Sequence, residues 1–259
     1  MTVTDPLLSI HGLNMRFGGV KALTNVSIDV ASGSIVSIIG PNWAGKTTFF
    51  NMICRLYEPS AGQILFQGQD LLRCKPHHLA GRGISRTFQN LALFRNGTVV
   101  DNLLVGMHSH LKSGVFDGGW YLGRTSREEC MARERVETII EFLEIEEIRH
   151  QPVSTLSYGL QKRVELGRAL ATQPKLLLLD EMVSGMNHEE TEDIARFVLD
   201  LRDELGITVL MIEHDMDVVM DISDAVHVLN FGCLIASGTP SEVSGNPAVV
   251  EAYLGVAQS

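Results

Sequence analysis

The residues with the clearest chemistry follow an apolar segment near the N-terminus. The stretch Gly40-Pro41-Asn42-Trp43-Ala44-Gly45-Lys46-Thr47 has the spacing G-x-x-x-x-G-K-[ST], between the apolar run Ile35–Ile39 and a helical pattern that includes Phe49. In such a loop the backbone N–H groups wrap around the phosphates of a nucleotide. Lys46 would reach the β- and γ-phosphates, and the Thr47 hydroxyl would hold Mg²⁺. A glycine-rich turn that merely starts a helix would leave the Lys-Thr pair unexplained, so the sequence predicts a nucleotide site.

Two adjacent acids supply the second chemical signal. Asp180 and Glu181 directly follow the apolar run Leu176-Leu177-Leu178-Leu179. A parallel sheet presents ligands at the carboxyl ends of its strands, so this strand would carry both acids to the ligand edge. Asp180 is expected to bind Mg²⁺, directly or through water, and Glu181 to polarise the attacking water. The alternative, two acids that only cap a strand, does not account for the phosphate loop upstream.

Trp43 is unusual within the loop, because most loops of this kind carry glycine at that position. If the backbone there needs a positive φ, a bulky residue costs about 1–2 kcal/mol. One interpretation is that the ring points toward solvent or a partner and the loop still works. The other is a weakened or blocked nucleotide site. The sequence does not separate the two.

Strands and helices must position these groups. Short strands are predicted at residues 7–10 and 26–30, within 62–68, and at the buried runs 35–39, 176–179 and 207–212. A hairpin is predicted near the C-terminus, from strands at residues 225–229 and 233–236. Helices are expected at residues 157–171 and after Asn187, a predicted N-cap. The apolar stripe of that second helix comprises Ile194, Phe197, Val198, Leu201 and Leu205. Strands that alternate with helices indicate an α/β fold with a parallel sheet.

Composition excludes several classes of protein. The 259 residues are 45% hydrophobic and suffice for one large domain with a core, and the apolar runs are shorter than a membrane span. The first residues lack the pattern of a signal peptide, which favours a cytosolic location. The formal net charge of −10 argues against a nucleic-acid surface. The four cysteines form no C-x-x-C pair, so a zinc site is not expected.

Further motifs in the same order resemble one family. The segment Leu156-Ser157-Tyr158-Gly159-Leu160-Gln161 is similar to the signature L-S-G-G-Q of the ATP-binding cassette (ABC) ATPases. Phe17 falls at the family's adenine-stacking aromatic, Gln89 at its Q-loop, residues 184–187 at its D-loop and His214 at its switch histidine. The resemblance covers nearly the whole chain. It implies a P-loop NTPase fold with a RecA-like parallel core, an antiparallel β subdomain and a helical subdomain.

The resemblance also implies a mechanism, in which two cassettes pair head to tail around two ATP molecules. Ser157 and Gly159 would then touch the γ-phosphate bound by the partner cassette, while His214 would hold the γ-phosphate and the water. Glu181, His214 and Gln89 are the expected catalytic residues, and Thr47, Gln89 and Asp180 the expected Mg²⁺ ligands. The residues expected to bind ATP are Phe17, Gly40, Asn42, Gly45, Lys46, Thr47, Thr48, Ser157 and Gly159.

Within the family, the chain looks like the ATPase of bacterial uptake systems for branched-chain and other hydrophobic amino acids. The residues that carry this likeness lie at 86–90, 106–121, 156–170, 213–216 and 252–255. The implied partners are a second cassette, identical or different, transmembrane permease subunits and, indirectly, a periplasmic solute-binding protein. The implied location is the cytoplasmic side of the inner membrane, as a peripheral subunit.

The expected organisation is a single nucleotide-binding domain over residues 1–259. Residues 1–90 and 160–240 would form the ATP-binding core with its β subdomain, 91–159 the helical subdomain, and 240–259 a C-terminal tail. Met182 replaces the proline that usually follows the catalytic Glu, which frees one φ angle. With Trp43, this leaves an alternative open: an impaired cassette that acts as a nucleotide-binding or dimerising scaffold. A related ABC system with another substrate is a further alternative.

Overall fold

The computed structural model describes residues 5–87, 92–107 and 124–254. The chain forms two compact units. Residues 1–79 together with 175–259 make the first unit, and residues 80–174 make the second. Within the described residues, no helix is both long enough and apolar enough to cross a membrane.

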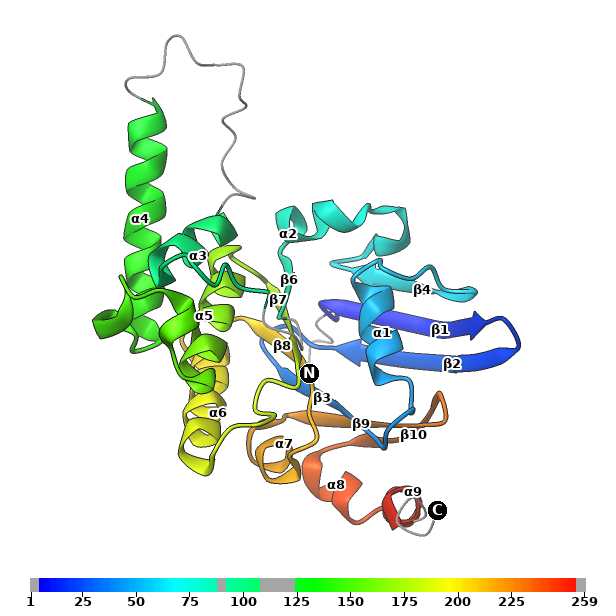
Figure 1. Cartoon of the computed structure of the whole chain (residues 1–259). Coiled ribbons are helices and arrows are strands. Elements are labelled where there is room, and N and C mark those ends of the chain that lie inside the picture. The colour runs from blue at the N-terminus through cyan, green and yellow to red at the C-terminus, as the bar shows by residue number, and fades with distance from the viewer. Residues whose placement is uncertain (1–4, 88–91, 108–123, 255–259) are drawn as a thin grey trace. The chain divides into compact units, whose positions relative to one another are not determined.

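The first unit contains an antiparallel sheet in the order β2-β1-β4-β5. Its strands are β1 (Leu8–Phe17), β2 (Val20–Val30), β4 (Ala61–Phe66) and β5 (Gln69–Asp70), and the first three run side by side in Figure 1. Leu8 pairs with Val30 on one side and with Phe66 on the other. The two short strands predicted at its start are therefore confirmed, but both extend much further than their period-two patterns indicated.

Five strands of the second sheet lie in this unit, in the order β10-β9-β3-β8-β7. They are β3 (Ile35–Ile39), β7 (Leu176–Asp180), β8 (Thr208–Ile212), β9 (Ala225–Asn230) and β10 (Cys233–Gly238). β3 is parallel to β8 and β9, β7 is parallel to β8, and only the β9–β10 hairpin is antiparallel. Every residue of β3, β7 and β8 is buried, as expected for strands covered on both faces.

The helices of the first unit are α1 (Lys46–Ile53), α6 (His188–Asp203), α7 (Met216–Ile222), α8 (Pro240–Ser244) and α9 (Pro247–Leu254). Two short 3₁₀ turns lie at Leu71–Arg73 and Pro76–His78. The predicted N-cap Asn187 is confirmed, because its side chain accepts the Glu190 N–H in a capping box. Leu205 was wrongly placed in the apolar stripe. The helix ends at Asp203, and Leu205 is 51% exposed before the left-handed Gly206.

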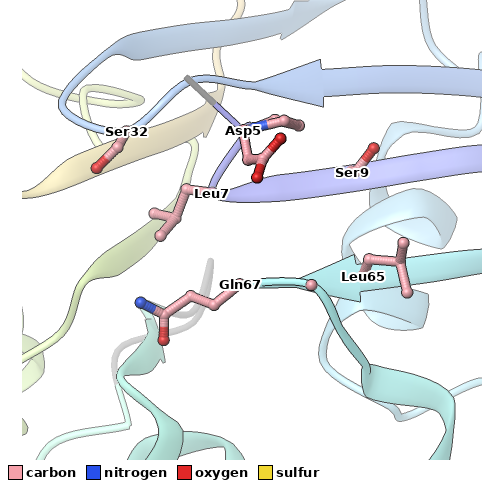
Figure 2. Close-up of a pocket in the computed structure, with 8 residues that line it drawn as sticks. Asp5, Leu7, Ser9, Ser32, Leu65 and Gln67 are labelled. Carbon is pink, nitrogen blue, oxygen red and sulfur yellow. The ribbon is translucent and has the colours of Figure 1, made fainter. Parts of the chain in front are cut away.

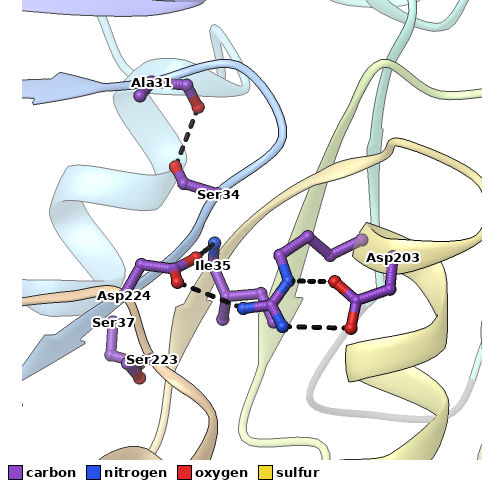
Figure 3. A network of polar contacts seen from close by, with 8 residues as sticks. Ala31, Ser34, Ile35, Ser37, Asp203, Ser223 and Asp224 are labelled. Atoms are coloured by element: carbon purple, nitrogen blue, oxygen red, sulfur yellow. Dashed lines mark hydrogen bonds and ion pairs between the residues drawn. The ribbon is translucent and has the colours of Figure 1, made fainter.

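An ion-pair network fixes where β3 begins (Figure 3). The Asp224 carboxylate accepts the Ile35 N–H at 2.7 Å and binds the Arg202 guanidinium at 3.1 Å. Arg202 also pairs with the neighbouring Asp203. The network therefore joins the last turn of α6, the segment before β9 and the first residue of β3, which is the strand that leads into the phosphate loop.

The second unit is mainly helical. Its elements are β6 (Ile84–Arg86), α3 (Val99–Met107), α4 (Arg124–Phe142), α5 (Tyr158–Ala171) and 3₁₀ turns at Glu146–Ile148 and Val153–Thr155; the short α2 (Leu79–Arg82) leads into it. α3 packs closely on α5, since a Cβ on Gly106 would lie 2.4 Å from the Arg168 carbonyl oxygen. The predicted helix at 157–171 is confirmed as α5.

Candidate functional site

The predicted phosphate loop joins β3 to α1. Lys46 is the first residue of α1 and is only 7% exposed. Its ammonium donates to the carbonyl oxygens of Gly40 at 2.6 Å and Pro41 at 3.0 Å, so the loop closes around it. Burial lowers the pKa of Lys46, and the negative charges of Glu181 and Asp180 oppose that shift. The loop lysine and the two predicted acids therefore share one electrostatic environment.

Three loop residues have a positive φ: Gly40 (147°), Trp43 (69°) and Gly45 (101°). From the sequence, this conformation was considered for Trp43 alone. A Cβ on Gly40 would lie 2.0 Å from the Leu229 carbonyl oxygen, and one on Gly45 would lie 2.7 Å from the Ala22 carbonyl oxygen. Glycine is thus required at both positions. Trp43 adopts the conformation that glycine would adopt there, and its side chain is 95% exposed.

Residues of the C-terminal part of the chain form hydrogen bonds with the backbone of the loop. The Gly232 N–H, in the β9–β10 turn, donates to the Ala44 carbonyl at 3.0 Å. The Tyr253 hydroxyl of α9 accepts the Gly40 N–H, and burial raises the pKa of that hydroxyl. Sequence analysis gave Tyr253 no role, because only the fold brings residue 253 to residue 40.

The two predicted catalytic side chains meet at the carboxyl ends of β7 and β8. The Glu181 N–H donates to the Ile212 carbonyl at 2.9 Å, which extends the pairing of the two strands by one residue. His214 Nε2 lies 2.9 Å from Glu181 Oε1, and the His214 side chain is 42% exposed. Asp180 ends β7 and is 2% exposed. The structure therefore brings Asp180, Glu181 and His214 to one edge of the sheet.

Glu213 lies beside this pair and was missed as a functional residue. Its side chain is 3% exposed. It accepts the Val183 N–H at 3.2 Å and also the backbone N–H groups of Met182 and His214. Burial raises the pKa of Glu213 to about 7, against these hydrogen bonds. The sequence signal was its place directly before the predicted switch histidine.

The remaining predicted residues of the first unit lie at its surface. Phe17 is 44% exposed at the end of β1, and its ring packs edge-to-face on Tyr57 with centroids 5.2 Å apart. Asn42 and Thr47 are exposed and Thr48 is half-buried. These side chains are accessible to a ligand, and their roles remain predictions.

The second unit carries the predicted signature residues. Ser157 is the N-cap of α5, and its hydroxyl accepts the Leu160 N–H at 3.3 Å. Gly159 is buried in the first turn, and the Gln161 side-chain amide donates to the Leu156 carbonyl at 2.9 Å. Gln89 lies outside the described residues, so its predicted contacts with Mg²⁺ and ATP stay a prediction.

An open cavity of about 520 Å³ lies elsewhere in the first unit (Figure 2). Asp5, Ser9, Ser32 and Gln67 are among the residues that line it. None of the predicted nucleotide-binding or catalytic residues that the structure describes takes part in it. The predicted site is instead the loop between β3 and α1 with the edge formed by β7 and β8.

Two family descriptions match the chain. The description "ABC transporter" matches residues 23–184, and "Branched-chain amino acid ATP-binding cassette transporter" matches residues 233–258. The second match covers β10, α8 and α9, which include the Tyr253 that contacts the phosphate loop.

Curated relatives match almost end to end. LivG of Escherichia coli (strain K12), a high-affinity branched-chain amino acid transport ATP-binding protein, is 43% identical over 98% of this chain and 100% of LivG. BraF of Pseudomonas aeruginosa, described in the same words, is 42% identical over the same shares.

Solved structures agree with the fold. The ADP conformation of an ATP-binding cassette from an ABC transporter has a TM-score of 0.84 and 35% identity, over 97% of this chain and 100% of that chain. A nucleotide-free cassette has a TM-score of 0.83 and 34% identity, over 96% and 98%. On these matches, this chain belongs to the ATP-binding cassette family and is the ATPase subunit of an ABC transporter.

Proposed function

We propose that this chain binds and hydrolyses ATP to power import of branched-chain or other hydrophobic amino acids. The observation that carries the hydrolytic part is the contact of 2.9 Å between Glu181 and His214 at the edge beside the phosphate loop. The substrate class is supported by the names of LivG and BraF and by the match of the C-terminal segment.

The phosphate loop binds the triphosphate. Its backbone N–H groups and the N-terminus of α1, which is the positive end of the helix dipole, attract the negatively charged phosphates. Lys46 exchanges its two loop carbonyl partners for phosphate oxygens as ATP enters. Phe17 offers an exposed ring on which adenine can stack. The proposed ATP contacts in this unit are Phe17, Gly40, Asn42, Gly45, Lys46, Thr47 and Thr48.

The residues present suit Mg²⁺, which prefers oxygen ligands. The Thr47 hydroxyl and the Asp180 carboxylate would hold the ion, with Gln89 as a further ligand. When bound, the ion neutralises charge on the phosphates. Asp180 is suited to this role because its place at the end of a buried strand fixes its backbone.

Glu181 and His214 divide the hydrolytic work. The Glu181 carboxylate accepts a hydrogen bond from the attacking water and polarises it, and His214 donates to the γ-phosphate. Their contact holds both side chains at the strand ends where water and phosphate would lie. Ser157 and Gly159 contact the γ-phosphate held by a partner cassette.

The assembly follows from family membership. Two cassettes, identical or different, close around ATP and drive transmembrane permease subunits, with a periplasmic binding protein that delivers the solute. The chain then lies at the cytoplasmic side of the inner membrane. The helical second unit, 80–174, supports the proposed helical subdomain at 91–159. The first unit, 1–79 with 175–259, supports the proposed tail at 240–259 and most of the proposed core at 1–90 and 160–240, whereas residues 80–90 and 160–174 of that core lie in the second unit.

The test is phosphate release by the purified chain with Mg²⁺ and ATP. Glu181→Gln should lower kcat by about 100-fold or more, within the range for loss of general-base catalysis, and leave ATP binding intact. Glu204→Gln, which changes an exposed acid at the end of α6, is the matched control and should behave as the native chain. Equal kcat for the native chain and Glu181→Gln would contradict the proposal.

A further inference from the structure

Glu213 is a buried acid for which the proposed mechanism has no use. It follows β8 directly and is 3% exposed. Transferring a carboxylate out of water is unfavourable unless hydrogen bonds compensate for the lost hydration. The hydrogen bonds that compensate for the burial of Glu213 therefore indicate what this side chain does.

Those contacts join the two chain segments that carry the proposed catalytic pair. The carboxylate accepts N–H groups from Met182 and Val183, the two residues after Glu181. It also accepts the N–H of His214, whose ring contacts Glu181 at 2.9 Å. One side chain thus fixes the backbone on both sides of the Glu181–His214 contact.

Only a carboxylate meets this requirement. An ionised carboxylate has two acceptor oxygens and no donor, which suits three converging N–H groups. A glutamine has one oxygen, and its NH₂ group would face at least one N–H. Met182 contributes one of these N–H groups, and a proline at this position would contribute none.

We propose that Glu213 is a positioning residue for ATP hydrolysis, which ties the segment after Glu181 to the backbone of His214 so that the two side chains stay in register. This inference rests on the proposed function. Glu213 acts through the two residues that would contact water and phosphate.

The energetics separate positioning from ordinary structural support. Burial opposes the ionised form of Glu213 and raises its pKa from 4.5 to about 7, so the stability of the fold falls as the pH rises through that window and stays lower above it. A neutral glutamine of nearly the same shape removes that burden, which offsets the cost of placing its NH₂ group against a buried N–H. If Glu213 served only to stabilise the fold, replacing it with glutamine would lower the midpoint of thermal unfolding.

The experiment compares the native chain with Glu213→Gln, Glu213→Asp and the control Glu204→Gln. At about pH 8 we expect Glu213→Gln to lower kcat by about tenfold or more, to leave the KM for ATP within about twofold, and not to lower the midpoint of thermal unfolding. Glu213→Asp, whose carboxylate is drawn back by about 1.5 Å, should also lose kcat at unchanged KM. If Glu213→Gln does not fold, the kcat and KM of Glu213→Asp test the proposal instead.

Met182→Pro supplies a rescue. It removes one of the three N–H groups, so Glu213→Gln should lose less kcat in that background than in the native one. An unchanged kcat in Glu213→Gln, or a loss of kcat accompanied by a lower unfolding midpoint in both Glu213 variants, overturns the inference. Failure of the proposed function looks different, since kcat would then be insensitive to Glu181→Gln as well.

Discussion

Replacing Trp43 by glycine tests how this chain accommodates a tryptophan in its phosphate loop. The backbone at Trp43 has φ 69°, a conformation that costs a residue with a Cβ about 1–2 kcal/mol. The ring is 95% exposed, so its removal sacrifices little buried apolar area. Glycine loses more chain entropy on folding, which offsets about 0.5–1 kcal/mol of the relief.

The comparison with Trp43→Ala isolates the free-energy cost of the positive φ, because alanine keeps the Cβ and loses the ring. We expect Trp43→Gly to be more stable than Trp43→Ala by about 0.5–1 kcal/mol, and Trp43→Ala to lie within about 0.5 kcal/mol of the native chain. Urea unfolding without nucleotide measures both differences. A Trp43→Gly chain that is less stable than Trp43→Ala would refute the strain argument.

Replacing Trp43 by glycine should change the affinity for MgATP less than it changes the stability of the fold. The strain at Trp43 is present in the free and the bound loop, so it cancels from the binding constant if the loop keeps its backbone. We therefore expect native chain and Trp43→Gly to bind MgATP with dissociation constants within about threefold. A gain of about tenfold or more in Trp43→Gly would show that the indole obstructs the phosphates, and would favour the impaired-cassette hypothesis.

Three further substitutions test the close packing at Gly40 and Gly106 and the burial of His227. Gly40→Ala should weaken ATP binding by about tenfold or more and destabilise the fold by about 2 kcal/mol or more, because the new Cβ meets the Leu229 carbonyl; nucleotide titration and urea unfolding measure the two effects. Gly106→Ala should lower the unfolding midpoint through its clash with the Arg168 carbonyl, while the KM for ATP stays unchanged. Burial lowers the pKa of His227 from 6.5 to about 4, so the unfolded chain binds the proton first and stability falls as the pH drops through that window. Between pH 7 and pH 5, the free energy of unfolding of His227→Gln, measured with urea, should therefore fall by about 2 kcal/mol less than that of the native chain.

Sequence reasoning succeeded where a signal is local. The spacing of Gly40, Gly45 and Lys46 predicts a loop whose geometry depends on neighbours a few residues away, and the structure has that loop. The N-cap at Asn187 is local in the same sense. The error at Leu205 is instructive, because the apolar spacing continued to Leu205 although the helix ends at Asp203, before the left-handed Gly206.

Residues with remote partners were missed. Glu213 and Tyr253 both accept backbone N–H groups from segments far away in the chain, and backbone groups leave no trace in residue identity. Glu213 stood in a quoted motif and Tyr253 in a quoted C-terminal match, but neither pattern indicates what the side chain contacts. Only the fold shows that Glu213 contacts the backbone beside the proposed catalytic pair and that Tyr253 contacts the predicted phosphate loop.

The central claim is that Glu181 is needed for cleavage of ATP and not for its binding. The most direct measurement is a single-turnover experiment in which radiolabelled ATP is bound to excess protein with Mg²⁺ and the bound nucleotide is analysed over time. The native chain should convert the bound ATP to ADP, whereas Glu181→Gln should retain it as ATP. Conversion at the native rate by Glu181→Gln, or no conversion by the native chain, would contradict the account.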